Sequence, residues 1–457
     1  MDKILGPIVG HVTPTTARLW ALCRPAGQPV KVQLQSPLGV AAEADAVEVA
    51  RGIHVCDVAG LTPGTRYTFQ LTDGQGAPLA LASGSFRTLE PTFDGFSFAV
   101  ASCHKHDFPA TEERWRRLVE RLESDSLRML LLCGDQIYAD SLWGVDYADD
   151  AHRLQSWENR YLEAWWRTPV QKAMGLAPTY MIWDDHDIRD DWGSRPEDAV
   201  APNQDNFRAA KEIYQRYQNA HNPPGYGGSV HYPVELGPIS FYFLDLRGAR
   251  KAGATWPIMG DAQWTDFETW LGQQQCEVLF LVSSVPLAHI GAAGLVYAKK
   301  MGIEAELKFD TLDHWNHPNN RHELKRMLDL LFEWQNAPGT DRQVVVIGGD
   351  VHVATVGTIF HPKPKPKNRI FQLTSSAISN GVDGGWRDLL PQVYRSLVTG
   401  KIDLGNGYYS LNDMCTDKPN FGEISLSRGA GGRWSLAFDI EHADTVQPRK
   451  RVLEVLL

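Results

Sequence analysis

Side chains that bind metal ions follow four strongly apolar runs of this sequence. The apolar runs are FSFAVA (96–101), MLLLC (129–133), YMIW (180–183) and VVVI (344–347). The segments after them are SCHKHD (102–107), GDQIYAD (134–140), DDHDIRDD (184–191) and GGDVH (348–352). Carboxylates suit hard cations, whereas thiolate, phenolate and imidazole groups suit transition metals. Because ligands of α/β sheets bind outside the carboxyl ends of the strands, the pattern predicts a metal site built from four separate segments.

Each segment alone has a simpler structural explanation. An Asp-Asp pair is usually a helix N-cap, and a Cys at the end of a strand usually fills the core. Several carboxylates at one sheet edge, however, would repel one another strongly in a low-dielectric site. Bound cations remove that repulsion, so the four segments together favour a metal centre.

The elements that must position these segments alternate between strands and helices. Further apolar runs lie at 241–244 and 278–282, and the helices expected between the runs include 111–124, 152–166, 204–221 and 322–336. Continuous apolar strands that alternate with helices predict an α/β core with a covered sheet. Trp157, Tyr161 and Trp165 follow the i, i+4, i+8 spacing of the core face of a helix. After residue 368 the sequence returns to strands and turns, with a hairpin expected from 423–427 and 434–440.

The first 90 residues have a different pattern. Short alternating runs are separated by the turn signals TPTT (13–16), PAG (25–27) and TPG (62–64), which is typical of half-buried strands of a sandwich. The stretch LTPGTRYTFQL (61–71), followed by GSFRT (84–88), resembles the last strands of a fibronectin-III-like sandwich. We therefore predict two domains, a β-sandwich over residues 1–90 and an α/β domain with the predicted metal site over residues 91–457.

Charge and composition exclude several classes of protein. The 457 residues carry 45 Lys and Arg against 55 Asp and Glu, a net charge of −10, so no electrostatic nucleic-acid partner is expected. The longest apolar stretch, 278–290, is shorter than the about 20 residues that cross a bilayer, so no membrane span is expected. The N-terminal sequence lacks the pattern of a signal peptide, and the six Cys form no CxxC pair, so we expect a cytoplasmic protein with reduced thiols. Cys23 and Cys56 could pair, although buried free thiols are the favoured interpretation.

The blocks GDQIY (134–138), WDDH (183–186) and GDVH (349–352) resemble the GDxxY, WDDH and GDxH blocks of the alkaline phosphatase D family. That family belongs to the calcineurin-like metallophosphoesterases. SCH (102–104), FLDLR (243–247), MGDAQW (259–264) and TSSAISN (374–380) are further matches in the family's order. The resemblance implies a metallophosphoesterase-type β-sandwich flanked by helices and preceded by a small all-β sandwich domain.

The resemblance also implies two metal sites. The residues implied for the first site, which holds Fe(III) in the family, are Cys103, Asp135, Tyr138 and His352. Those implied for the second site, whose ions in the family include calcium, are Asp185, Asp350 and one of the pair Asp190 and Asp191, with Asp135 as the bridge. We predict Asp190 as that ligand, although the family often has Asn there. We also predict a divalent ion at the second site, with calcium favoured. His186 matches the catalytic histidine beside the leaving-group oxygen.

The implied function is hydrolysis of small phosphomonoesters or phosphodiesters by a metal-activated water at a dinuclear site. A phosphodiesterase or a phospholipase D-like enzyme is the alternative within this class. A metal-containing binding module without catalysis is the alternative from another class. Arg247 and Arg250 could contact a phosphate, or could form an ion pair such as Asp245–Arg247.

Overall fold

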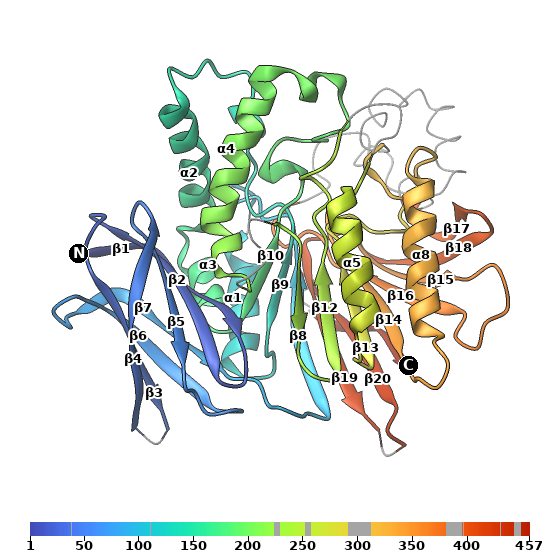
Figure 1. Cartoon of the computed structure of the whole chain (residues 1–457), viewed down its shortest axis with the longest axis horizontal. Helices are drawn as coiled ribbons and strands as arrows, with labels where there is room; N and C mark the ends of the chain where they lie inside the picture. The colour runs from blue at the N-terminus through green and yellow to red at the C-terminus, as the bar shows by residue number, and fades with distance from the viewer. Residues whose placement is uncertain are drawn as a thin grey trace.

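The computed structural model describes residues 1–37, 39–109, 111–223, 229–251, 257–290, 312–380, 395, 397–429, 431–442 and 449–457. The N-terminal strands lie at the left of Figure 1, and the strands of the remaining chain lie in its middle and right. All statements below concern these residues.

The N-terminal part is all-β, as predicted. Its strands are β1 (Asp2–Val12), β2 (Thr16–Arg24), β3 (Val30–Ser36), β4 (Gly39–Ala50), β5 (Ile53–Ala59), β6 (Arg66–Asp73) and β7 (Pro78–Arg87). They pair antiparallel in the order β1-β2-β5-β4-β3-β6-β7 and enclose their own hydrophobic core, which includes Leu19, Val32 and Phe69. Strand β7 ends at Arg87 and the next strand begins at Gly95. The domain boundary at residue 90 stays a prediction.

Two further sheets follow the N-terminal strands. The first has the order β10-β9-β8-β19-β20-β21 and consists of β8 (Gly95–Ala101), β9 (Leu130–Cys133), β10 (Thr179–Ile182), β19 (Asn420–Arg428), β20 (Trp434–His442) and β21 (Arg449–Leu456). The second has the order β11-β12-β13-β14-β16-β15-β18-β17 and consists of β11 (Tyr232–Glu235), β12 (Ile239–Phe243), β13 (Val278–Val282), β14 (Gln343–Gly348), β15 (Ala354–Phe360), β16 (Arg369–Thr374), β17 (Gly400–Gly405) and β18 (Tyr408–Thr416). The predicted C-terminal hairpin is β19–β20.

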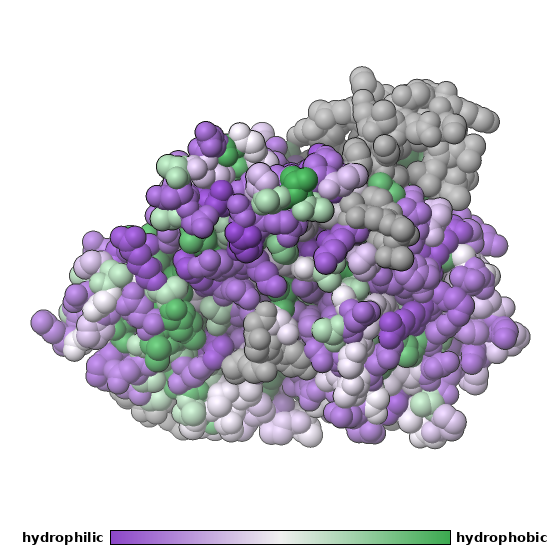
Figure 2. Space-filling model, turned by 45° about the horizontal axis from the view of Figure 1, so that its top comes forward, coloured by the Kyte–Doolittle hydropathy of each residue, from purple (hydrophilic) through white to green (hydrophobic). Residues whose placement is uncertain are grey.

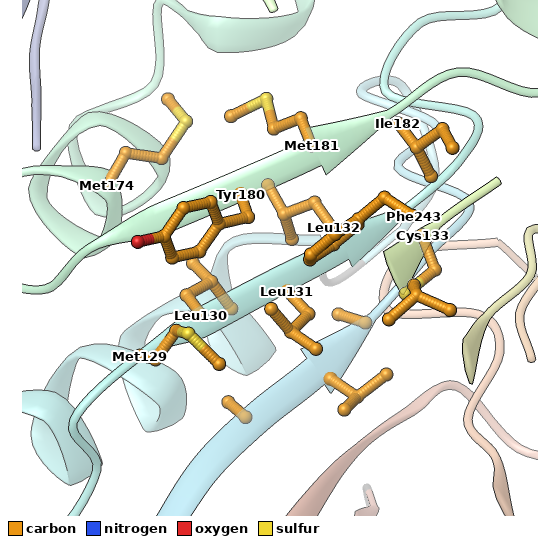
Figure 3. Packing of buried hydrophobic residues seen from close by; sticks show 14 of the residues in the cluster. Met129, Leu130, Leu131, Leu132, Cys133, Met174, Tyr180, Met181, Ile182 and Phe243 are labelled. Atoms are coloured by element: carbon orange, nitrogen blue, oxygen red, sulfur yellow. The ribbon is translucent and has the colours of Figure 1, made fainter. Parts of the chain in front are cut away.

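These two sheets pack face to face. Phe98 of β8 meets Phe241 of β12 and Phe280 of β13 edge-on, at ring-centroid distances of 5.3 and 5.2 Å. Tyr242 points to the opposite face of its sheet and packs in a separate core, because successive side chains of a strand alternate between faces. Figure 3 shows the apolar side chains of β9 and β10 packed together, with Phe243 of β12 beside them. This arrangement explains why the strands read as continuous apolar runs.

Helices cover the outer faces. They are α1 (Thr111–Glu123), α2 (Asp150–Trp165), α3 (Thr168–Met174), α4 (Ala201–Tyr217), α5 (Asp261–Gln273) and α8 (Arg321–Gln335), with the short 3₁₀ turns η1 (Asp140–Leu142), η2 (Asp185–Asp187), η3 (Pro196–Ala199) and η4 (Asn219–His221). Helices α5 and α8 lie over the second sheet in Figure 1, where they share its outer hydrophobic core. The predicted fold class, a sandwich of sheets flanked by helices after an all-β domain, is confirmed. The aromatic face Trp157, Tyr161 and Trp165 is buried in α2, as predicted.

The N-terminal strands pack directly on β10 and on the nearby α4 and η4. The indole of Trp20 donates to the carbonyl of Arg216 (2.9 Å), and the His11 ring lies within hydrogen-bonding distance of the Tyr180 hydroxyl (3.0 Å). At Gly10 an added Cβ would lie 2.1 Å from the carbonyl oxygen of His221, so this contact requires glycine. The all-β domain therefore helps to fix the position of β10, whose end enters the candidate site.

Within the described ranges, no helix is long and apolar enough to cross a membrane. Figure 2 shows that hydrophilic residues cover most of the face turned forward, and that hydrophobic residues form patches among them. Exposed hydrophobic residues include Val47 and Val49 of β4 and Leu81 of β7. The six cysteines are free, and Cys23 and Cys56 are both buried, in agreement with the favoured interpretation.

Candidate metal centre

The ends of four strands deliver the predicted ligands to one place. Strands β8, β9 and β10 run parallel and side by side, so Cys103, Asp135 and Asp185 leave the same edge of the first sheet. Strand β14 of the facing sheet delivers Asp350 and His352. The geometry expected from the carboxyl ends of strands is therefore present, although the strands belong to two facing sheets rather than one.

The first cluster combines a sulfur, a carboxylate and an imidazole. Ligand atoms of Cys103, Asp135 and His352 lie within 4.8 Å of one another. The Cys103 Sγ is 3.3 Å from Asp135 Oδ2, and the Tyr138 hydroxyl is 3.4 Å from His352 Nε2. The four residues predicted for the first metal thus lie together.

The second cluster consists mainly of carboxylates. Three overlapping groups each have ligand atoms within 4.8 Å of one another. These groups are Asp135, Asp185 and His186; Asp184, Asp185 and Asp350; and Asp185, Asp190 and Asp191. Asp185 belongs to all three groups, and Asp135 also belongs to the first cluster. Asp190 and Asp191 both lie here, with 55% and 13% of their side chains exposed.

Several of these residues have left-handed backbones. The φ angles are +56° at Cys103, +56° at Asp135, +62° at Asp350 and +55° at His352. A non-glycine residue in this region costs of order 1–3 kcal/mol and persists where the surrounding structure enforces it, most often at functional sites. The sharp turns after β8, β9 and β14 are what turn these side chains back into a common centre.

The electrostatics of the centre fit bound cations. Burial raises the pKa of Asp135 and of Asp350 well above the usual range, and the neighbouring Asp184 and Asp185 raise both further. Burial likewise raises the pKa of the Cys103 thiol, and Asp135 adds to that shift. Three buried oxygens, Oδ1 of Asp135, Oδ2 of Asp184 and Oδ1 of Asp185, have no hydrogen-bond partner among the described residues. Buried carboxylates with unpaired oxygens require compensation, and the mixture of hard and soft donors matches a metal pair.

His186 has a partner that sequence reasoning missed. Its Nδ1 donates to the carboxylate of Asp140 (2.9 Å), and its ring packs on the Tyr138 ring with a centroid distance of 4.3 Å. Burial alone would lower the pKa of His186, but the carboxylates of Asp140 and Asp185 outweigh it and raise that pKa well above the usual value. Asp140 stands at the end of the GDQIYAD segment, and that position is the one signal that could have identified it.

Arg247 forms ion pairs and is not exposed to a substrate. Its guanidinium is fully buried, donates to Asp184 and makes two bonds of 2.6 and 2.5 Å to Asp313. Arg250 also pairs with Asp313 at 3.1 Å. The ion-pair interpretation is therefore correct for Arg247, but its partners are Asp184, Asp313 and, at 3.6 Å, Asp185. Asp245 instead accepts the backbone N–H of Arg247 (3.0 Å).

Two further polar residues brace the ligand segments. Asp187 accepts the backbone N–H groups of Asp135 and Asp184, both at 2.9 Å, and thereby ties the ends of β9 and β10 together. His104 is buried between Ser379 and the carbonyl of Ala164, each 2.8 Å from a ring nitrogen. Asp187 and His104 hold the surrounding loops in place.

Comparisons with known proteins agree with this geometry. The family model for PhoD-like phosphatases matches residues 98–401, a range that contains every predicted ligand. A solved structure of PhoD has a TM-score of 0.69 at 16% identity, covering 98% of this chain and 92% of that chain. The purple acid phosphatase PPD1 from yellow lupin (Lupinus luteus) seeds has a TM-score of 0.60 at 12% identity, covering 98% of this chain and 73% of that chain. The two structural similarities show a shared fold, and the search of curated proteins found no match.

Proposed function

Because this chain belongs to the PhoD-like phosphatase family and is a metal-dependent hydrolase of phosphoesters, we propose that the clusters described above form its dinuclear site. The observation that carries this proposal is the position of Asp135, which lies in both the sulfur-containing cluster and the carboxylate cluster. A carboxylate in that position can bridge two cations. Membership of this family of hydrolases argues against the alternative of a non-catalytic binding module.

The donor sets support different ions at the two sites. The proposed first-site ligands are Cys103, Asp135, Tyr138 and His352, whose thiolate and phenolate donors favour Fe(III). The proposed second-site ligands are Asp135, Asp185, Asp190 and Asp350, all carboxylates, which favour a hard divalent ion such as Ca²⁺. When bound, such a pair activates a water molecule as nucleophile and neutralises charge on the phosphoryl oxygens.

His186 is the proposed general acid. Its Nδ1 is occupied by Asp140, and its Nε2 faces the carboxylate cluster, 3.7 Å from Asp190 Oδ1. The Tyr138 ring covers one face of the imidazole and fixes its orientation. In its charged form, His186 can pass the Nε2 proton to the leaving-group oxygen while Asp140 stabilises the imidazolium.

Replacing Asp140 by asparagine should lower kcat by about 10²-fold, because His186 loses the group that orients it and stabilises its charge. The metal content should stay unchanged, since Asp140 is not a proposed ligand and the asparagine Oδ1 can still accept the backbone N–H of Asp190 (2.7 Å). Steady-state kinetics together with elemental analysis tests this expectation. Asp146→Asn, at an exposed position close in sequence, is the matched control and should retain full activity.

The direct test of the function uses two chromogenic substrates. The purified protein should hydrolyse 4-nitrophenyl phosphate or bis(4-nitrophenyl) phosphate, lose that activity with a strong chelator, and regain it with added iron and calcium. The ratio of the two rates separates a phosphomonoesterase from the phosphodiesterase or phospholipase D-like alternative. Elemental analysis of the protein as purified identifies the ions. No hydrolysis of either substrate with both ions bound would contradict the proposal.

Two other expectations stay predictions. The net charge of −10 supports a small phosphoester rather than a nucleic acid as substrate. A cytoplasmic location is likewise a prediction.

A further inference from the structure

The loop after β16 contacts the non-carboxylate ligands of the first site. Ser376 is fully buried, and its Oγ lies 3.2 Å from Cys103 Sγ. The same oxygen accepts the backbone N–H of His352 at 3.1 Å. Ser376 therefore links two proposed ligands that come from different sheets.

The neighbours of the Cys103 sulfur leave the Ser376 hydroxyl as its hydrogen-bond donor. Four groups lie within hydrogen-bonding distance of Cys103 Sγ: the Ser102 hydroxyl, an Asp135 oxygen, the Asp350 carbonyl and the Ser376 hydroxyl. The carboxylate and the carbonyl are acceptors only, and the Ser102 hydroxyl donates its single proton to the carbonyl of Ser375 (3.4 Å). When Cys103 is a thiolate, Ser376 is thus the donor available to it among these neighbours.

Asn380, four residues later, makes the equivalent contact with the phenol. Its Nδ2 donates to the Tyr138 hydroxyl at 2.7 Å and lies 3.2 Å from His352 Nε2. An amide nitrogen carries two protons, so it can donate to the Tyr138 oxygen and, while no metal occupies the Nε2 lone pair, to His352 as well. The loop therefore reaches the sulfur, the phenol and the imidazole of the first site.

The loop itself is fixed on the opposite sheet by Asn420 of β19. The Asn420 side chain accepts from the Ser375 hydroxyl (2.9 Å) and donates to the Ser376 carbonyl (2.8 Å), and its backbone N–H donates to Ala377 (2.6 Å). Donors held this firmly are oriented before any ion binds. Groups that hydrogen-bond to ligands in this way orient them and tune the metal.

We propose that Ser376 and Asn380 are positioning residues of the first metal site: Ser376 donates to the Cys103 sulfur, and Asn380 to the Tyr138 oxygen. The inference rests on the proposed function, because it requires Cys103 and Tyr138 to be ligands. Neither residue is proposed to touch the substrate.

Cobalt(II) added to the metal-depleted full-length protein tests this role without any activity assay. Wild type should show a thiolate-to-cobalt absorption band. In Ser376→Ala the band should move to longer wavelength, because loss of the hydrogen bond raises the energy of the sulfur electrons, and cobalt should bind about tenfold more weakly. Asn380→Ala should weaken binding by a similar factor but leave the band in place.

Ser240→Ala is the matched control, because Ser240 is a buried hydroxyl on β12 that bonds to Gln274 and belongs neither to the loop nor to the proposed ligands. It should keep both the band and the affinity of wild type. If Ser376→Ala does not fold, Asn380→Ala decides, since Asn380 is only half-buried. The role of the loop would be overturned if Asn380→Ala bound cobalt as tightly as wild type and any folded Ser376→Ala kept both the band wavelength and the affinity of wild type. Absence of a thiolate band in wild type would overturn the metal site itself, and the inference with it.

Discussion

Replacing Arg247 by methionine should lower the free energy of unfolding by about 3–5 kcal/mol, the usual effect of breaking a buried ion pair from one side. Arg247 has no exposed surface, and it neutralises Asp184 and Asp313 at the same time. A methionine fills much of the space but leaves two buried carboxylates beside Asp185 and Asp350. Asp313 keeps Arg250, whereas Asp184 has no other ion-pair partner among the described residues.

Urea unfolding of the metal-free protein measures this effect. Arg208→Met, which removes an exposed arginine from its pair with Asp205 on α4, is the control and should change stability little. Arg247→Lys should not restore stability, because an ammonium group cannot make the two parallel bonds to Asp313. If the urea midpoint of Arg247→Met were close to that of wild type, Asp184 and Asp313 would not be ionised in the folded protein.

The strands that carry the ligands could be predicted because they are buried on both faces. A buried strand such as 129–133 reads as an unbroken apolar run, so the polar residues after it stand out as a change of composition. The helix boundaries also agree within a few residues, since their apolar periodicity is strong. These patterns do not show that β14 lies in a different sheet from β8, β9 and β10.

The partners of the ligands could not be predicted in the same way. Arg247 and Asp313 are 66 residues apart, and Ser376 and Cys103 are 273 residues apart. No local pattern encodes such contacts, because they depend on how the two sheets face each other. Sequence reasoning therefore named Asp245 as an example of a partner for Arg247, where the structure has Asp184, Asp185 and Asp313.

Asp140 is an intermediate case. It stands in a segment that was singled out, but its side chain is one of many carboxylates there. Its role became visible only when the structure placed it on Nδ1 of His186, 46 residues away. Types and spacing thus identified the candidate centre, while the roles of individual carboxylates required three-dimensional contacts.

Among the substitutions considered, Asp135→Asn should have the largest effect on activity. Asp135 lies in both clusters, with Oδ2 3.3 Å from the Cys103 sulfur and with Oδ1 free of hydrogen bonds among the described residues. Asparagine has the same shape, but it lacks the charge and one of the two oxygens that a bridge needs. Since the proposed reaction requires both cations, kcat should fall by about 10³-fold or more.

The metal-free form of Asp135→Asn should nevertheless be more stable than metal-free wild type. Burial first, and then Asp185 and Asp184, raise the pKa of Asp135 well above that of an unfolded chain. A group with a raised pKa destabilises the folded state at neutral pH, where the unfolded chain holds the carboxylate charged at no penalty. Asparagine removes that charge and tolerates the left-handed φ of +56° as aspartate does. We therefore expect a higher Tm together with lost activity.

Asp439→Asn on β20 provides the opposite control. Burial alone would raise the pKa of Asp439, but Arg451 and Arg449 outweigh it and lower that pKa, so its charge stabilises the folded state. Asparagine at this position should lower the Tm and leave kcat unchanged, because Asp439 lies outside the candidate centre. Thermal unfolding without metal and steady-state kinetics with metal separate the two patterns. If Asp135→Asn lowered the Tm as Asp439→Asn does, or retained activity within tenfold of wild type, Asp135 would be a structural carboxylate rather than the bridge between two cations.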